Sequence, residues 1–173
     1  MVSMSAKFTV GKEEFKQFDS QLKKILEECE KSRETLLSLM EEDVKVYGDV
    51  NKALELSKSN EAERNKRSEA IQKATIMAMI VPLKATMCCL YVLQQTRALV
   101  DIVNPNLISD VGVACYLADA AFQCASLNVE INLATINDQS LVEKVKDEIG
   151  HAEKKVEVVF KEIKERVLEK MRR

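Results

Sequence analysis

Residues 104–132 are the stretch that most constrains how this chain can fold. The stretch opens with helix-start signals, because Asn104 suits an N-cap, Pro105 suits the first helical position and Ser109 is a second possible cap. Beyond Pro105 it contains no proline and one glycine, and apolar residues fall on nearly every side. A helix that is apolar all round is usually buried all round. We therefore predict a central core helix that ends near Leu133 and is wrapped by the other helices.

The composition predicts an all-α protein. The chain has 173 residues, enough for one domain with a substantial core, and only four glycines and two prolines, very few for a turn-rich β architecture. Long helices joined by short connections indicate an up-down bundle of antiparallel helices. The net charge of −2 gives no electrostatic case for binding nucleic acid.

The first third of the chain reads as one short and one long helix. Residues 1–10 look like the remnant of a first helix that Gly11 ends. A long amphipathic helix is then expected from Glu13 to about Leu56, because apolar residues recur there at three-and-four spacing. Its predicted apolar stripe consists of Phe15, Phe18, Leu22, Ile25, Cys29, Leu36, Met40, Val44, Tyr47 and Val50.

Two further long helices flank the core stretch. One is expected over residues 61–103, with Ser59 or Asn60 as its cap, and the last begins after a turn, with Asn137 or Asp138 as its cap. The last helix is regular and amphipathic, with Glu and Lys on its outer side. Its predicted stripe consists of Leu141, Val145, Ile149, Ala152, Val156, Val159, Ile163 and Val167.

Residues 74–93 are mostly apolar and as long as a bilayer span. Pro82 and Lys84 lie at the middle, however, and a central lysine costs about 3 kcal/mol on insertion. A buried core helix is the better interpretation, kinked at Pro82 because proline removes one backbone hydrogen bond. Two such core helices present apolar surface on more sides than four helices can cover. We therefore predict no membrane segment and a homodimer or higher homo-oligomer.

The residue types that hold metals or drive nucleophilic catalysis are scarce. The five cysteines lack C-x-x-C spacing, and the only histidine, His151, is flanked by charged residues. No metal site and no Ser-His-Asp triad are expected from this set. An odd number of cysteines without a secretory signal favours a reducing compartment, so we predict a cytoplasmic protein.

Two polar residues of the core stretch share one face. Asp110 and Asn128 lie about five helical turns and about 27 Å apart, and Asn132 follows one turn later. One chain cannot bring Asp110 and Asn128 to the same ligand atom, but an antiparallel copy of the helix in a symmetric dimer would bring the two ends together. In the alternative interpretation, Asp110 stabilises the first helical turn and the asparagines are satisfied groups in a helix–helix seam.

Six short motifs, in order, resemble the cyclodeaminase domain of the formiminotransferase-cyclodeaminase family, which includes stand-alone methenyltetrahydrofolate cyclohydrolases. No single motif is specific, but their order and spacing extend over nearly the whole chain. The strongest are Asn104 with Ser109-Asp110, and Asn128-Val129-Glu130-Ile131-Asn132-Leu133. The others are Thr9-Val10-Gly11-Lys12 with Phe15, Asp43 with Tyr47, Glu61 to Arg67, and Val81-Pro82-Leu83.

The resemblance implies one helical domain over residues 1–173, dimeric or larger, that opens or closes the methenyl bridge of a tetrahydrofolate derivative. The folate is the substrate, and no further cofactor is implied. A positioned carboxylate can transfer the proton, with Asp110 as the first catalytic candidate and Asp43 as the second. Lys12 is expected to meet the anionic tail of the folate. The other expected substrate-binding residues are Asn104, Ser109, Asn128 and Asn132.

Three departures from the family pattern leave a second interpretation open. Family members usually carry a Pro-Gly-Gly-Gly-Ser loop ahead of the first helix, whereas this sequence begins at Met1 inside that helix. Val103 and Cys124 stand where glycine is usual. A missing glycine loop would remove backbone donors from the pocket. The alternative is therefore a non-catalytic family descendant, a dimeric helical protein that binds a partner or a folate without turnover.

Overall fold

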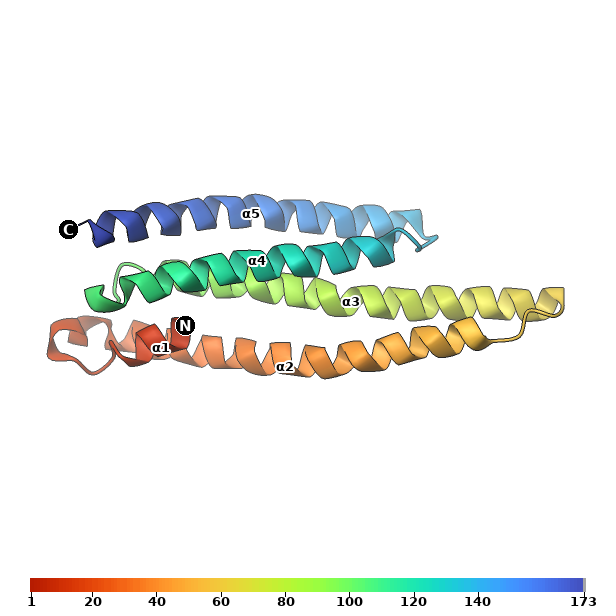
Figure 1. Ribbon diagram of the computed structural model, residues 1–173, viewed down its shortest axis with the longest axis horizontal. Coiled ribbons are helices and arrows are strands. Elements are labelled where there is room, and N and C mark those ends of the chain that lie inside the picture. Colours follow the sequence, from red (N-terminus) through yellow and green to blue (C-terminus); the bar gives the residue numbers. More distant parts are fainter. Residues whose placement is uncertain (173) are drawn as a thin grey trace.

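The computed structural model describes residues 1–172 and shows an up-down bundle of long helices (Figure 1). Within this range all regular elements are helical, and each long helix runs antiparallel to the next, which confirms the all-α prediction. The α-helices are α1 (Val2–Lys7), α2 (Asp19–Glu55), α3 (Glu61–Leu99), α4 (Ile108–Leu133) and α5 (Gln139–Met171). The 3₁₀ turns are η1 (Glu13–Phe18) and η2 (Pro105–Leu107).

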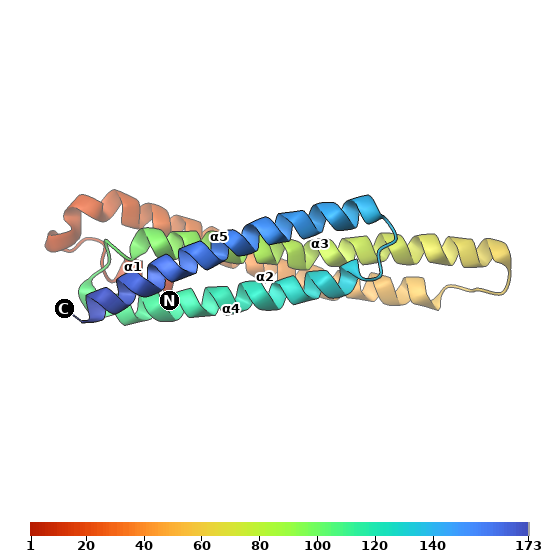
Figure 2. The ribbon, with the colours of Figure 1, turned by 90° about the horizontal axis from the view of Figure 1, so that it is seen from above.

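The helix α3, and not α4, occupies the centre of the bundle. It packs against α2, α4 and α5, while α1 sits between α2 and α4 at one end (Figures 1 and 2). The prediction that α4 is buried all round is wrong within a single chain. Leu127 and Ile131 are 64% and 68% exposed, because neighbours cover only part of the helix circumference.

Side-chain caps begin three of the elements. Asn60 accepts a hydrogen bond from the backbone N–H of Glu63 at the start of α3, and Asp138 caps α5 in the same way. Asn104 caps the short turn η2, which then leads directly into α4. Ser109 lies inside the first turn of α4 and is exposed, so the prediction that it is a cap is wrong.

The predicted stripe on α2 is right in its first half and wrong in its second. Met40, Val44 and Tyr47 are all about two-thirds exposed or more. The buried positions instead recur every seven residues, the repeat by which long helices keep one seam facing a neighbour. Five of the seven buried residues of α2 follow this repeat, Ile25, Ser32, Leu39, Val46 and Ala53, and the other two, Leu22 and Cys29, are themselves seven residues apart. The helix α2 thus carries a second apolar face, which no element within residues 1–172 covers.

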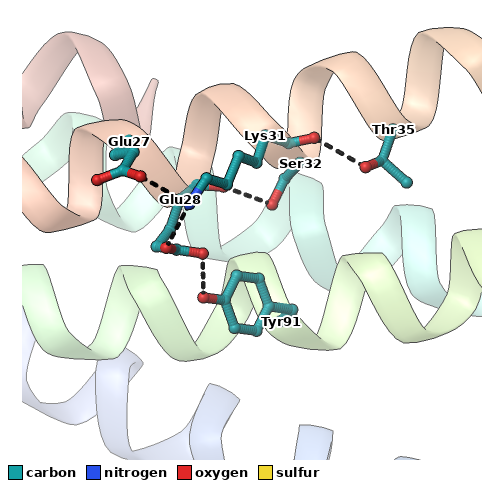
Figure 3. A network of polar contacts seen from close by, with 6 residues as sticks. All are labelled: Glu27, Glu28, Lys31, Ser32, Thr35 and Tyr91. Carbon is teal, nitrogen blue, oxygen red and sulfur yellow. Dashed lines mark hydrogen bonds and ion pairs between the residues drawn. The ribbon is translucent and has the colours of Figure 1, made fainter.

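Polar contacts from α3 hold it against α2. The Tyr91 hydroxyl donates a hydrogen bond to Glu28 Oε2 at 2.7 Å, and Lys31 also bonds this carboxylate (Figure 3). These bonds, that from Tyr91 first, lower the pKa of Glu28. About two turns before Tyr91 in α3, Lys84 Nζ lies 3.4 Å from Glu42 Oε1 of α2. The lysine in the apolar stretch 74–93 therefore has an ion-pair partner.

The helix α3 continues without interruption through Pro82, and the Thr86 hydroxyl donates to the Pro82 carbonyl at 2.9 Å. Both α3 and the segment Pro105–Leu133 are long and apolar enough to cross a membrane. The core helices of soluble proteins satisfy the same criterion, so this is weak evidence for a span. In this fold the two segments pack against each other.

Candidate functional site

A cavity of about 310 Å³ opens between α2 and α4, with α3 as its floor. Asp43 enters it from α2 and Asn128 from α4, so two residues that the sequence singled out lie in one place. Within residues 1–172 neither side chain has a hydrogen-bond or ion-pair partner. Both polar groups are therefore available to a ligand.

Small and apolar side chains form the rest of this cavity. Pro82 belongs to its floor, Ala85 and Ala125 leave room above that floor, and Met40 forms part of the α2 wall. None of these four residues was predicted from the sequence to belong to the site. The available signal was Pro82, a proline inside an otherwise apolar core helix.

A second cavity, of about 350 Å³, continues the first toward α1 and shares Leu36 with it. We call the two together the α2–α4 groove. Its α4 wall in this part includes Ala114, Leu117 and Ala121, which lie between Asp110 and Asn128 in the helix. Cys89 also lines this part, and burial raises the pKa of its thiol to about 11, which keeps it protonated.

Four further candidates, Lys12, Asn104, Ser109 and Asp110, lie toward the other end of α4 and line neither cavity. Asp110 is partly buried in the first turn of that helix, and Ser109 beside it is exposed. Lys12 is exposed before η1. Asp110 is about 27 Å from Asn128 along the helix axis. One chain therefore pairs Asp43, and not Asp110, with the asparagine.

A protein-family model for formiminotransferase-cyclodeaminase matches residues 1–151. The chain belongs to this family. A crystal structure of formiminotetrahydrofolate cyclodeaminase from Thermotoga maritima superposes with a TM-score of 0.85 at 27% identity, covering 96% of this chain and 79% of that one.

Relatives of this family carry names from folate metabolism. The methenyltetrahydrofolate cyclohydrolase of Methylorubrum extorquens is 33% identical over 144 residues, which is 83% of this chain and 69% of that protein. The formimidoyltransferase-cyclodeaminase of Rattus norvegicus is 27% identical over 150 residues, 87% of this chain but 28% of the rat protein. The chain thus spans most of the bacterial relative and about a quarter of the mammalian one.

Two of the family-like motifs meet through a hydrogen bond. The Thr9 hydroxyl, which is fully buried, donates to the Ser5 carbonyl at 2.7 Å and accepts from the Asn104 backbone N–H at 3.1 Å. The Asn104 side chain meanwhile accepts a hydrogen bond from the Asn106 N–H and so caps η2. Both the backbone N–H and the side chain of Asn104 therefore form hydrogen bonds within the fold. The Thr9–Asn104 bond fixes α1 to the start of α4, and thereby one end of the groove.

The Asn132 side chain has a partner inside its own helix. Its Nδ2 donates to the Asn128 carbonyl at 2.8 Å, and it does not line the groove. Its role in substrate binding stays a prediction. Among the described residues there is no group of three or more His, Cys, Asp or Glu side chains placed to hold a metal ion.

Proposed function

We propose that this protein is a folate one-carbon enzyme that acts on the methenyl bridge of tetrahydrofolate. The hydrolase reaction adds water to methenyltetrahydrofolate, and the deaminase reaction forms the methenyl bridge from the formimino derivative with loss of ammonia. The observation that carries the proposal is the family match over residues 1–151 together with a free carboxylate in an apolar groove. The relatives described above have enzyme names, which favours a catalytic protein over a non-catalytic descendant.

In either reaction a proton moves at a nitrogen or oxygen atom bonded to the one-carbon centre, and we assign this transfer to Asp43, which lines the cavity. A positioned carboxylate contributes about 10²- to 10⁴-fold to such steps. In the hydrolase direction Asp43 would take a proton from the attacking water and return it to the departing ring nitrogen. The Asn128 amide can donate to and accept from the polar edge of the substrate. Met40 and Pro82 would pack against its flat ring.

The groove is open on the side where α4 exposes apolar residues, which supports a homodimer. Leu117, Leu127 and Ile131 are each more than half exposed, and α2 adds Val44 and Tyr47. A second copy packed antiparallel on α4 would cover these side chains and bring the partner's Asp110 toward the Asn128 end. Asp110 and Asp43 would then act in one site built from two chains. The five free cysteines agree with a cytoplasmic, reducing location.

The test is to mix the purified protein with methenyltetrahydrofolate and follow the loss of its absorbance, and in parallel to measure ammonia release from formiminotetrahydrofolate. Acceleration of the first reaction identifies a cyclohydrolase, and of the second a cyclodeaminase. Without acceleration of either, and without thermal stabilisation by any reduced folate, the proposal would be wrong. Stabilisation without turnover would instead identify the non-catalytic alternative.

A further inference from the structure

A third cavity, of about 250 Å³, lies where α2 gives way to α3, and positive charge surrounds it. Among the residues that the structure describes, no acidic side chain lines this cavity. The α2–α3 connection contributes Lys58 and the first turns of α3 contribute the rest. The lining residues are Lys58, Arg64, Arg67, Ser68, Ile71 and Gln72.

The charges of Lys58 and Arg64 are not neutralised by the chain. Neither side chain has a hydrogen-bond or ion-pair partner anywhere in residues 1–172. The neighbouring Glu63 carboxylate is engaged elsewhere, since the Ser57 hydroxyl and the Ser59 N–H both donate to its Oε2. A cavity lined by unpaired cations attracts an anion with several charged groups.

The third cation is held in position by the end of α2. Arg67 donates from Nε and Nη2 to the Leu54 carbonyl, at 3.2 and 3.1 Å. A guanidinium has five N–H donors, so Nη1 stays free to bond a carboxylate or phosphate. Because these bonds tie α3 to the end of α2, a change at Arg67 would alter the structure as well as the charge of the cavity, so Arg67 is left unchanged in the experiments below. The positive end of the α3 dipole adds to the field.

This cavity and the α2–α4 groove open on the same side of α3. Ile71 lines the cavity and Pro82 lines the groove, and eleven residues bring a helix back to nearly the same side after about 16 Å. A bound molecule with a flat ring at Asp43 and an acidic chain directed along α3 would reach Arg64 and Lys58. Lys12, the residue expected to meet such a tail, lies before η1 and lines none of these cavities.

We propose that Lys58, Arg64 and Arg67 bind an oligoanion, a chain that carries two or more carboxylates or phosphates. Where the proposed folate activity holds, on which this part rests, the ligand is the glutamate tail of the substrate, and γ-linked glutamates beyond the first strengthen binding. A free polyphosphate presents the same chemistry. The site itself does not depend on which of the two occupies it.

The first experiment measures the site without turnover. Isothermal titration calorimetry is run with tripolyphosphate and with penta-γ-glutamate on the wild type, on the double variant K58Q/R64Q and on the charge-matched control K66Q/K73Q. Lys66 and Lys73 are exposed cations of the same helix outside the cavity. The K58Q/R64Q variant should weaken binding roughly tenfold and the control hardly at all. Equal weakening in both variants, or no binding to the wild type, would overturn the proposal.

The second experiment identifies the source of the anion. The KM for the methenyl folate is compared with one and with five glutamates on the tail. A lower KM for the longer tail that K58Q/R64Q removes, with kcat unchanged, assigns the tail to the cavity. Turnover with equal KM values overturns the tail assignment, and calorimetry with tripolyphosphate then supports a phosphate ligand. Absence of turnover with both substrates contradicts the proposed function alone, since calorimetry still decides the site.

Discussion

Asp43 on α2 and Asn128 on α4 face one cavity over Pro82, although they lie in different halves of the sequence. The two helices that carry them are separated by α3, which packs against both. The side chains therefore meet across an open groove and leave space for a flat molecule between them. Among residues 1–172 no side chain forms an ion pair with Asp43, so its carboxylate is free for chemistry.

Replacing Asp43 with asparagine should reduce kcat for methenyltetrahydrofolate about 10²-fold or more, because the amide cannot exchange a proton as a carboxylate does. The KM should change little, since the shape of the side chain is kept. Stopped-flow absorbance gives both constants, and circular dichroism checks the fold. Asp43 is exposed and unbonded within the described chain, so the unfolding transition should not move.

The matched variant Asp110→Asn separates two versions of the site. In a site shared between two chains, Asp110→Asn also lowers kcat, and mixing the two inactive variants restores part of the activity. Activity of D43N equal to that of the wild type would contradict the role given to Asp43. Loss of activity in D110N alone would return the catalytic role to the first turn of α4.

Much of the fold was predictable because local signals act on local structure. Asn60 and Asp138 begin their helices where their side chains reach free backbone N–H groups. The regular α5 stripe is buried at seven of its eight predicted positions, since an amphipathic helix on the outside of a bundle has one apolar face and one neighbouring layer. The antiparallel order follows from the short connections.

The pairing of Asp43 with Asn128 was not predictable from the sequence, because it depends on how α2 and α4 register against α3. The predicted stripe on α2 takes two successive steps of four residues after Leu36, which turn it off the seam that buries Leu39 and Val46, so Met40 and Tyr47 lie on the surface. The exposure of one α4 face likewise depends on how many neighbours the helix has. Both of these are properties of packing and not of periodicity.

The Thr9 hydroxyl should contribute more to stability than an exposed threonine with a similar bond. Thr9→Val keeps the shape but leaves the Asn104 N–H without its acceptor, at a cost of about 1–3 kcal/mol. Thr35 donates in the same way to the Lys31 carbonyl but is exposed, so Thr35→Val should cost about 0.5 kcal/mol or less. Urea unfolding measures both variants. Equal losses of unfolding free energy in the two variants would show that the Thr9–Asn104 bond between α1 and α4 does not stabilise the fold.

The cysteines should differ in reactivity according to burial. Burial raises the pKa of Cys89 and of Cys115 to about 11, so about one thiol in a thousand is ionised at pH 8, whereas Cys124 is exposed. Iodoacetamide followed by peptide mass spectrometry should label Cys124 first and the other two only on unfolding.

The same raised pKa values have a consequence for stability. Between the ordinary thiol pKa of 9.0 and about 11, the unfolded chain releases these protons and the folded chain keeps them, so stability should fall as the pH rises through that window. Urea midpoints at pH 8.5 and 10.5, for the wild type and for a Cys89→Ala, Cys115→Ala variant, give the size of the effect. An identical pH slope in both proteins would contradict it.

The apolar face of α4 should hold two copies together. Leu127→Glu with Ile131→Glu places two carboxylates on that face and removes burial worth roughly 1.5–3 kcal/mol per side chain. Each change occurs twice in a symmetric dimer, so the dissociation constant should rise by a factor of about 100 or more. Sedimentation equilibrium over a concentration series measures it. The control is Val158→Glu, the same kind of change at a 56% exposed position on α5. A wild type that sediments as a monomer, or a control that dissociates equally, would show that the exposed face of α4 does not mediate self-association, and Asp43 and Asn128 would then act within one chain.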